Sequence, residues 1–187
     1  MKYFETIKCN DNEIYNIHYH EKRVAKTIGK NLNLHEYIYP PNNHLLKCKV
    51  IYTDDEIVDV SFDIYNKRDI NTFQIIIDDN INYKYKYENR EDINNLFLQK
   101  DTADEIIIIK NNLITDTSIA NIAIFIDNQW YTPKKPLLYG TTRQRYIDNG
   151  ILKEIDIDIN LFKKAEKLAL LNAMVDFDII EDYKILF

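Results

Sequence analysis

The sequence has little of what several common classes of protein require. Its two cysteines, Cys9 and Cys48, are too few for a disulfide framework in 187 residues and lack the CxxC spacing. We therefore expect two buried free thiols. No apolar stretch approaches the length of a membrane span, and the N-terminal MKYFETIKCN has no apolar signal-peptide core. These absences lead us to expect a cytoplasmic protein with no membrane partner.

Glycine is also scarce, with three residues, and the chain contains neither a Walker loop nor a GxGxxG motif. A Ser-His-Asp arrangement is missing as well. His18 and His20 are two positions apart and could face the same way, but no Cys, Asp or Glu constellation completes a site, so we expect no metal. The net charge of −6 disfavours a nucleic-acid partner, because it implies no basic face.

What the chain does contain is typical of a globular protein. Hydrophobic residues make up 45% and charged residues 29% of the sequence. A chain of this length can bury one sizeable core, or two smaller ones that share an interface. We expect the second arrangement, with an N-terminal domain over residues 1–75 and a C-terminal domain over residues 76–187.

The first half reads mainly as strands. Alternation predicts strands at 3–8 and 13–18, a hairpin of 45–53 with 56–65, and a strand at 72–77. A helix is expected to start near His20 and to end near Gly29. A second, short helix over 34–39 would be stopped by Pro40 and Pro41. The mixture predicts an α+β domain.

The second half mixes strands and helices more evenly. We expect a strand at 83–87, a helix through 92–97, and strands at 105–109 and 119–126. Thr141 or Thr142 can cap a helix that ends before Gly150. The apolar spacing over 161–175 is compatible with one helix.

Three features of this half could carry chemistry. Gly140-Thr141-Thr142-Arg143 opens the predicted helix, and such a start favours an anion because unpaired N–H groups and the helix dipole point to it. Asp116 ends a strand, and Asn121 interrupts the apolar run that follows. Lys84 and Lys86 are expected to share one face of a strand, and periodicity cannot choose between them as a reactive amine.

The combination of these motifs resembles the class IV aminotransferases, the pyridoxal-phosphate (PLP) enzymes of fold type IV. Lys86-Tyr87-Glu88-Asn89-Arg90 looks like the Lys-x-x-Asn-Arg signature around the Schiff-base lysine of 4-amino-4-deoxychorismate lyases, a branch of that family. The resemblance therefore selects Lys86, with Lys84 in reserve. It also implies a short helix to about Ala165 and a strand from Leu168 to Met174 in place of one helix.

The resemblance implies a role for further residues around the cofactor. Asp116 and Asn121 match the family's motif of an acid, four residues and Asn, in which the acid pairs with the pyridine nitrogen of PLP. The family usually has Glu where this chain has Asp, which is one methylene shorter. Thr142 would bind the phosphate through its hydroxyl, and the amides of Thr141 and Thr142 through their N–H groups.

Residues outside this stretch complete the implied site. His20-Glu21-Lys22-Arg23 resembles an N-terminal His-x-x-Arg motif whose arginine also reaches the phosphate; the alternative is that Arg23 is a surface residue of a helix. Asn172 falls where the family has a small polar residue beside the phosphate. Lys49 is a weaker assignment, either as a partner of a substrate carboxylate or as an exposed strand lysine.

The fold implied is α+β in two small domains with PLP in the cleft between them, in a homodimer. The activity implied is that of a 4-amino-4-deoxychorismate lyase, which acts on a small-molecule amino substrate through a Lys86 aldimine and releases pyruvate to give 4-aminobenzoate. Two alternatives stay open: an amino-acid transaminase of the branched-chain or D-amino acid type, and a non-catalytic relative. Asp116 and the chain's short length, compared with most of the family, motivate the last.

Overall fold

The computed structural model describes residues 1–186 and divides the chain into two compact units. Unit 1 contains residues 1–67 together with Tyr85–Asn89, and unit 2 contains Arg68–Lys84 and the chain from Arg90 onward. The segment Tyr85–Asn89 belongs to unit 1 because it runs beside the first strand. The Phe4 N–H donates to the Lys86 carbonyl at 2.9 Å, and the Glu88 N–H donates to the Lys2 carbonyl at 3.1 Å.

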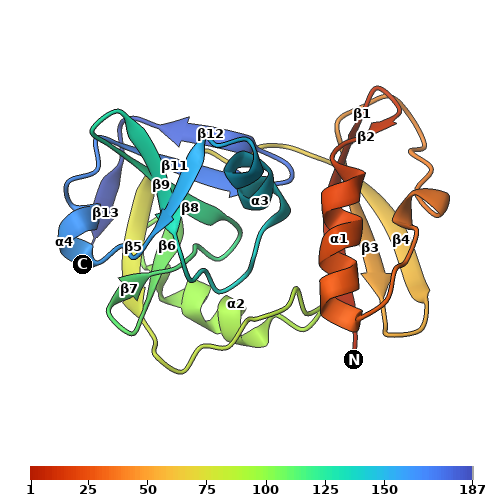
Figure 1. Cartoon of the computed structure of the whole chain (residues 1–187), viewed down its shortest axis with the longest axis horizontal. Helices are drawn as coiled ribbons and strands as arrows, with labels where there is room; N and C mark the ends of the chain where they lie inside the picture. Colours follow the sequence, from red (N-terminus) through yellow and green to blue (C-terminus); the bar gives the residue numbers. More distant parts are fainter. Residues whose placement is uncertain (187) are drawn as a thin grey trace. The chain divides into compact units, whose positions relative to one another are not determined.

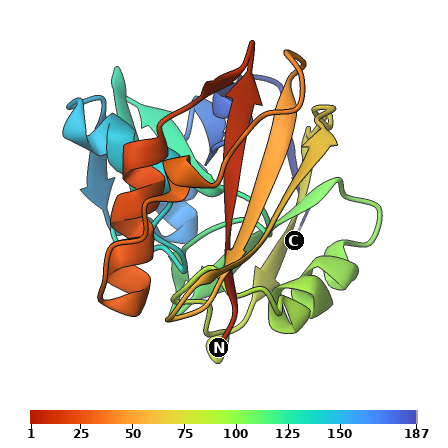
Figure 2. The ribbon, with the colours of Figure 1, turned by 90° about the vertical axis from the view of Figure 1, so that its right-hand side faces the viewer.

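Unit 1 is an antiparallel sheet with one helix over a face (Figures 1 and 2). Its strands, in spatial order, are β2 (Glu13–Ile14), β1 (Tyr3–Asn10), β3 (Leu46–Tyr52) and β4 (Ile57–Ile64). Helix α1 (Ile17–Ile28) ends at Gly29, whose positive φ of 75° suits a residue without a side chain. A single 3-10 turn, η1 (Leu34–Glu36), follows.

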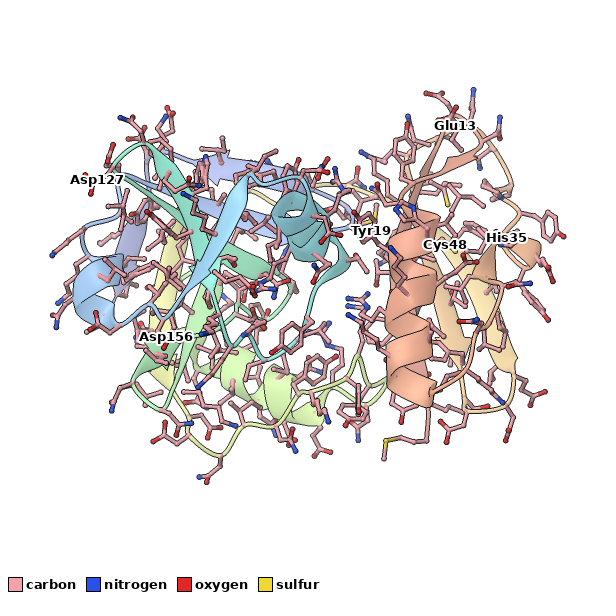
Figure 3. The ribbon with its side chains drawn as sticks, viewed as in Figure 1. Glu13, Tyr19, His35, Cys48, Asp127 and Asp156 are labelled. Carbon is pink, nitrogen blue, oxygen red and sulfur yellow. The ribbon has the colours of Figure 1, made fainter. Side chains whose placement is uncertain are left out.

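The core of unit 1 lies between this sheet and α1. Tyr3, Ile7 and Cys9 alternate along β1 and pack with Val24 of α1, as expected for one face of a pleated strand. Cys48 of β3 belongs to the same cluster (Figure 3). Both cysteines are buried and free, which confirms the prediction of unpaired thiols.

Unit 2 contains two sheets. One has the order β10 (Leu152–Ile155), β9 (Gln129–Pro133), β8 (Asn121–Ile126), β11 (Lys167–Asn172), β12 (Asp176–Ile180). The other has the order β13 (Lys184–Leu186), β5 (Thr72–Ile77), β6 (Glu105–Lys110), β7 (Leu113–Ile114). The helical elements are α2 (Glu91–Phe97), η2 (Leu98–Lys100), α3 (Thr141–Asp148) and α4 (Ile159–Phe162).

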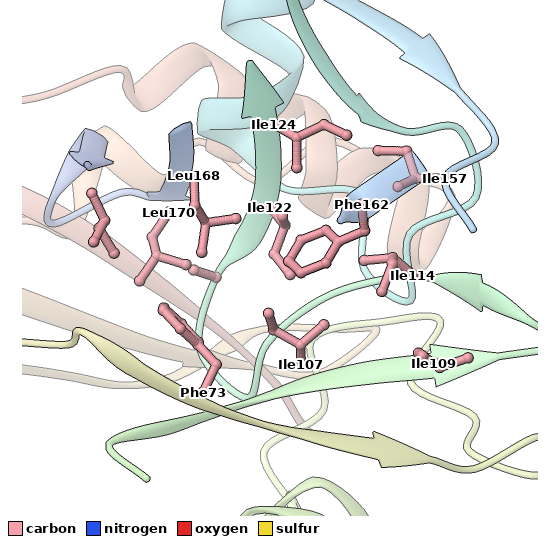
Figure 4. Packing of buried hydrophobic residues seen from close by; sticks show 12 residues of the cluster. Phe73, Ile107, Ile109, Ile114, Ile122, Ile124, Ile157, Phe162, Leu168 and Leu170 are labelled. Atoms are coloured by element: carbon pink, nitrogen blue, oxygen red, sulfur yellow. The ribbon is translucent and has the colours of Figure 1, made fainter. Parts of the chain in front are cut away.

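The core of unit 2 is built by residues from both sheets (Figure 4). Phe73 and Ile107 come from the sheet of β5 and β6, and Ile122 and Leu168 come from the sheet of β8 and β11. Phe162 of α4 joins them (Figure 4). The continuous apolar run at β6 is fully buried, as its composition predicts, because residues on both faces of this strand are covered.

Several sequence-based expectations were wrong. Residues 83–87 form no strand: a single backbone bridge pairs Tyr87 with Tyr3, so strand alternation does not describe Lys84 and Lys86. The expected strand at 13–18 is two residues long, because α1 starts at Ile17.

Residues 161–175 are not one helix, and α4 followed by β11 confirms the arrangement implied by the resemblance. Over residues 1–186, no helix is long and apolar enough to cross a membrane.

Candidate functional site

The residues assigned from the sequence fall into two sets, one in each unit. Unit 1 holds Arg23, Lys49 and Lys86. Unit 2 holds Asp116, Asn121, Thr141, Thr142 and Asn172.

Asp116 is a buried carboxylate in the turn between β7 and β8. Its side chain accepts a hydrogen bond from the Asn121 Nδ2 at 2.6 Å and another from the Leu138 N–H at 2.9 Å. Burial raises the pKa of Asp116 to about 6, against the lowering effect of these hydrogen bonds and of Arg143. A carboxylate that is so poorly solvated gains free energy when a cationic N–H group comes into contact with it.

The turn that carries Asp116 is fixed by its own side chains and by two charged neighbours. The Thr117 hydroxyl accepts from the Ala120 N–H at 2.9 Å, which closes the turn. Arg90 Nη2 donates to the Ser118 carbonyl at 2.5 Å, and Glu105 accepts from the Ser118 N–H at 3.2 Å. Sequence reasoning gave neither charged residue a role. Arg90 was visible as the last residue of the lysine signature, whereas Glu105 looked like the edge of an apolar strand.

Asn121 connects the carboxylate to the start of α3. Its Nδ2 donates both to Asp116 and, at 2.8 Å, to the Leu138 carbonyl. A Cβ on Gly140 would lie 1.9 Å from the Asn121 Oδ1, so only glycine permits this approach. Asn121 therefore orients the Asp116 carboxylate. The absence of a side chain at Gly140, the residue before α3, leaves room for the Asn121 amide.

The start of α3 has the composition of an anion-binding site. Gly140 makes no side-chain cap, and Thr141 and Thr142, both buried, form the first turn. First-turn N–H groups have no partner within the helix, and the dipole adds positive potential there. Arg143 in the same turn donates instead to the Pro133 carbonyl at 2.7 Å and to Glu154 at 2.6 Å. This arginine holds α3 against β9 and β10.

Replacing Gly140 with alanine is expected to destabilise the protein by about 1–3 kcal/mol, since the added methyl group must displace the Asn121 amide. Urea unfolding of the two proteins measures the effect. Gly150→Ala is the matched control: its position has a φ of 73° but nothing within 4 Å of an added methyl group, so a loss of about 1 kcal/mol from backbone conformation is expected. A Gly140→Ala protein as stable as the wild type would contradict this account of Asn121.

Asn172 lies at the end of β11 and is committed to a local turn. Its Oδ1 accepts from the Met174 N–H at 2.9 Å and from the Val175 N–H at 3.0 Å. Its Nδ2 is 3.4 Å from the Ile119 carbonyl, which belongs to the turn between Asp116 and Asn121. Asn172 thus contacts the turn that carries the carboxylate.

In unit 1, two of the assigned lysines gather around one aromatic ring. The Lys86 Nζ lies 4.5 Å and the Lys49 Nζ 5.5 Å from the centroid of Phe4. Both distances are within the range of a cation–π contact. Phe4 is itself buried and binds the Lys86 carbonyl through its N–H, so β1 positions this lysine through backbone and ring together. Sequence reasoning missed this role of Phe4.

Arg23 forms a buried cluster with Glu5 and His20. Burial alone would raise the pKa of Glu5, but the Arg23 charge and hydrogen bonds from His20 and Arg23 hold it at about 2. Burial lowers the pKa of His20, against the raising effect of Glu5. His20 is therefore neutral near pH 7 and donates its Nδ1–H to the carboxylate. Among the described residues, no group of three or more His, Cys, Asp or Glu side chains could hold a metal ion.

Comparison with known proteins relates this chain to a family. Residues 90–180 match the family model described as amino-transferase class IV. An uncharacterized protein from Haemophilus influenzae is 35% identical over 182 residues, which are 91% of this chain and 96% of the relative.

Many solved structures are similar, and three of them span the range of sequence identity. A candidate 4-amino-4-deoxychorismate lyase from Haemophilus somnus is 30% identical, with a TM-score of 0.84 and coverage of 92% of this chain and 96% of that one. A candidate amino-acid aminotransferase from Mesorhizobium loti is 16% identical, with a TM-score of 0.81 and 99% coverage of both. A hypothetical aminotransferase from Mycobacterium tuberculosis, in a PLP-bound form, is 12% identical with a TM-score of 0.82, covering 98% and 81%. These similarities confirm the expected α+β fold of type IV, and the first two occur in chains of about this length.

Proposed function

Because this chain belongs to the class IV aminotransferase family, we propose that it is a PLP-dependent enzyme, closest in its reaction to 4-amino-4-deoxychorismate lyase. The observation that carries the proposal is the buried Asp116 tied through Asn121 to the glycine at the start of α3. A carboxylate for a ring nitrogen and a helix start for a phosphate are thereby joined in one unit. PLP requires both.

The residues present fit this cofactor. The Asp116 carboxylate is buried and its pKa is raised, so it favours contact with a protonated ring nitrogen over solvent. Gly140 leaves the helix start without a Cβ, and a Cβ there would collide with Asn121. The side chain of Asp116, which is shorter than the usual Glu, is fixed by hydrogen bonds from the Leu138 N–H and the Asn121 amide.

Each residue then has one task. Asp116 keeps a proton on the ring nitrogen, and Asn121 orients Asp116. Thr142, the amides of Thr141 and Thr142, and Arg23 bind the phosphate. Asn172 supports the turn that carries Asp116, through its contact with the Ile119 carbonyl.

Lys86 would supply the amine that holds the cofactor covalently, and its Nζ would be the base that accepts a proton from the substrate carbon. Bound PLP supplies an electron sink for the bond broken at that carbon. In the lyase reaction, 4-amino-4-deoxychorismate loses pyruvate and leaves 4-aminobenzoate. Lys49, whose Nζ lies near the same Phe4 ring as that of Lys86, is a weaker assignment, as the residue that binds a carboxylate of the substrate.

The choice of the lyase over a transaminase rests on Lys86-Tyr87-Glu88-Asn89-Arg90 and on the name of the similar protein from Haemophilus somnus. An amino-acid transaminase of the branched-chain or D-amino acid type shares every step up to proton removal. A non-catalytic relative would keep the fold without the cofactor. The expected homodimer stays a prediction that the particle mass in solution tests.

Uptake of PLP is the first test. Purified protein mixed with PLP is expected to gain an absorption band in the near-ultraviolet to violet. Borohydride is expected to fix the cofactor on Lys86, and peptide mass analysis would then locate it there. A protein that stays colourless and takes up no PLP would overturn both enzymatic readings and favour the non-catalytic relative.

Two assays then separate the reactions. The first measures 4-aminobenzoate formed from 4-amino-4-deoxychorismate, and the second measures amino-group transfer to 2-oxo acids. We expect the first reaction. Transfer without 4-aminobenzoate would establish the transaminase instead.

A further inference from the structure

Glu5 is an acid in a row of buried residues. Tyr3, Glu5, Ile7 and Cys9 alternate on the face of β1 that α1 covers, and Glu5 is completely buried. Both of its oxygens are bound. Oε1 accepts from the Arg23 Nε at 2.8 Å, and Oε2 accepts from the Arg23 Nη2 and, at 2.6 Å, from the His20 Nδ1.

The geometry fixes the plane of one guanidinium. His20 and Arg23 are three positions apart on α1, so both reach the same side of the helix. Nε and one Nη of an arginine bind a carboxylate side by side, and this bidentate contact sets the orientation of the whole planar group. The hydrogen bond between the His20 Nδ1 and the Glu5 Oε2 restricts the rotation of the carboxylate in turn.

A contribution to the stability of the fold does not by itself explain the buried cluster of Glu5, His20 and Arg23. Buried ion pairs often contribute no more than apolar side chains of the same volume, because desolvation offsets the attraction. The core around the cluster is otherwise apolar. Arg23, in contrast to Glu5, keeps 13% of its side chain exposed, so the cluster extends from the core toward the surface.

We propose that Glu5 and His20 are positioning residues, which hold the Arg23 guanidinium in the orientation that binds the phosphate of the cofactor. The inference rests on the proposed use of PLP. It assigns a role to two residues of unit 1, Glu5 and His20, that the proposed function leaves without one. Under this proposal their contribution is to affinity for the phosphate group.

A comparison of PLP with pyridoxal, which lacks the phosphate, tests this role without measuring turnover. Spectroscopic titration of the wild-type protein is expected to show tighter binding of PLP than of pyridoxal. In Glu5→Gln the affinity for PLP is expected to fall by roughly tenfold or more, because a charge-assisted contact that orients Arg23 is lost. The affinity for pyridoxal should change by less than about twofold, since no phosphate contact is involved.

Helix α1 offers a matched control. Glu21 accepts from the His35 Nδ1 at 2.9 Å, and both residues are much more exposed than Glu5 (Figure 3 labels His35). Glu21→Gln makes the same chemical change on the helix that carries Arg23 and His20, and it should leave both affinities within about twofold of the wild type. His20→Gln is the second variant, for use if Glu5→Gln fails to fold, and is expected to weaken PLP selectively by a few-fold.

The outcomes separate the two proposals. A wild-type protein that binds neither compound overturns the proposed function. A wild-type protein that prefers PLP, with Glu5→Gln or His20→Gln keeping the same preference, overturns the positioning role alone. Equal losses for PLP and pyridoxal would also overturn it, because they indicate a general structural effect.

Discussion

Replacing Lys86 with alanine is expected to lower turnover by about 10⁴-fold, because one amine both binds the cofactor covalently and moves the substrate proton. The fold should survive. The side chain is partly exposed, and its contact with the Phe4 ring is worth no more than about 1 kcal/mol. Steady-state kinetics with added PLP, and the absorption band of the mixture, measure both consequences.

Lys84→Ala is the matched control for this prediction, since it removes the same side chain two positions away. We expect its turnover to stay within about twofold of the wild type, because the proposed function gives this exposed lysine no part in the reaction. An inactive Lys84→Ala protein beside an active Lys86→Ala protein would transfer the role to Lys84. Partial recovery of Lys86→Ala by an added small primary amine would further identify proton transfer as the lost step.

Replacing Asp116 with asparagine is expected to lower turnover by about 10²–10³-fold while PLP is still taken up. The amide has the size of the carboxylate but no negative charge, so it cannot keep a proton on the ring nitrogen. Phosphate contacts and Lys86 are unchanged, which is why uptake should persist. Asp116→Glu, which restores the charge, is the control and should retain more activity than Asp116→Asn. Equal activity of Asp116→Asn and the wild type would remove Asp116 from the site.

The same variant tests the buried carboxylate in the cofactor-free protein. The folded-state pKa of Asp116 is about 6 and the ordinary value is 3.8, so the folded state binds the proton more tightly than the unfolded chain. Its contribution to stability is complete below about pH 3.8 and is lost as the pH rises through 6. The free energy of unfolding of Asp116→Asn, relative to wild type, should therefore rise by on the order of 2 kcal/mol between pH 4 and pH 7. Denaturant unfolding at the two pH values measures it.

The strands and helices that follow from local pattern were predictable, and those that depend on partners were not. The apolar run of β6 and the hairpin of β3 and β4 are strands because their residues suit a buried or half-buried sheet in any context. Residues 83–87 alternate in the same manner, but they form one bridge to Tyr3 instead of a ladder. Tyr85 and Tyr87 pack edge to face with each other, and both pack against Tyr3. Aromatic packing therefore accounts for an alternation that looked like a strand.

Glu5 and Glu105 show why part of the site was hidden. Glu5 lies within the alternating strand β1 and Glu105 at the start of the apolar run of β6, and both are completely buried. Glu5 meets Arg23, eighteen positions away, and Glu105 meets the Ser118 N–H, thirteen positions away. A single sequence shows neither pairing, because hydrogen bonds across such separations depend on how the strands and helices pack.

The sequence by itself determined the residue types and their spacing: an acid and an asparagine five positions apart, a Gly-Thr-Thr-Arg helix start, and a lysine signature. Those features are local, so they can be read along the chain. Only the tertiary structure decided what the residues do to one another. Burial raises the pKa of Asp116, and the approach of Asn121 excludes any side chain at Gly140. Glu5 and His20 give Arg23 one orientation. Solvation, steric exclusion and bidentate hydrogen bonding all depend on which atoms lie within a few ångströms, and folding alone brings those atoms together.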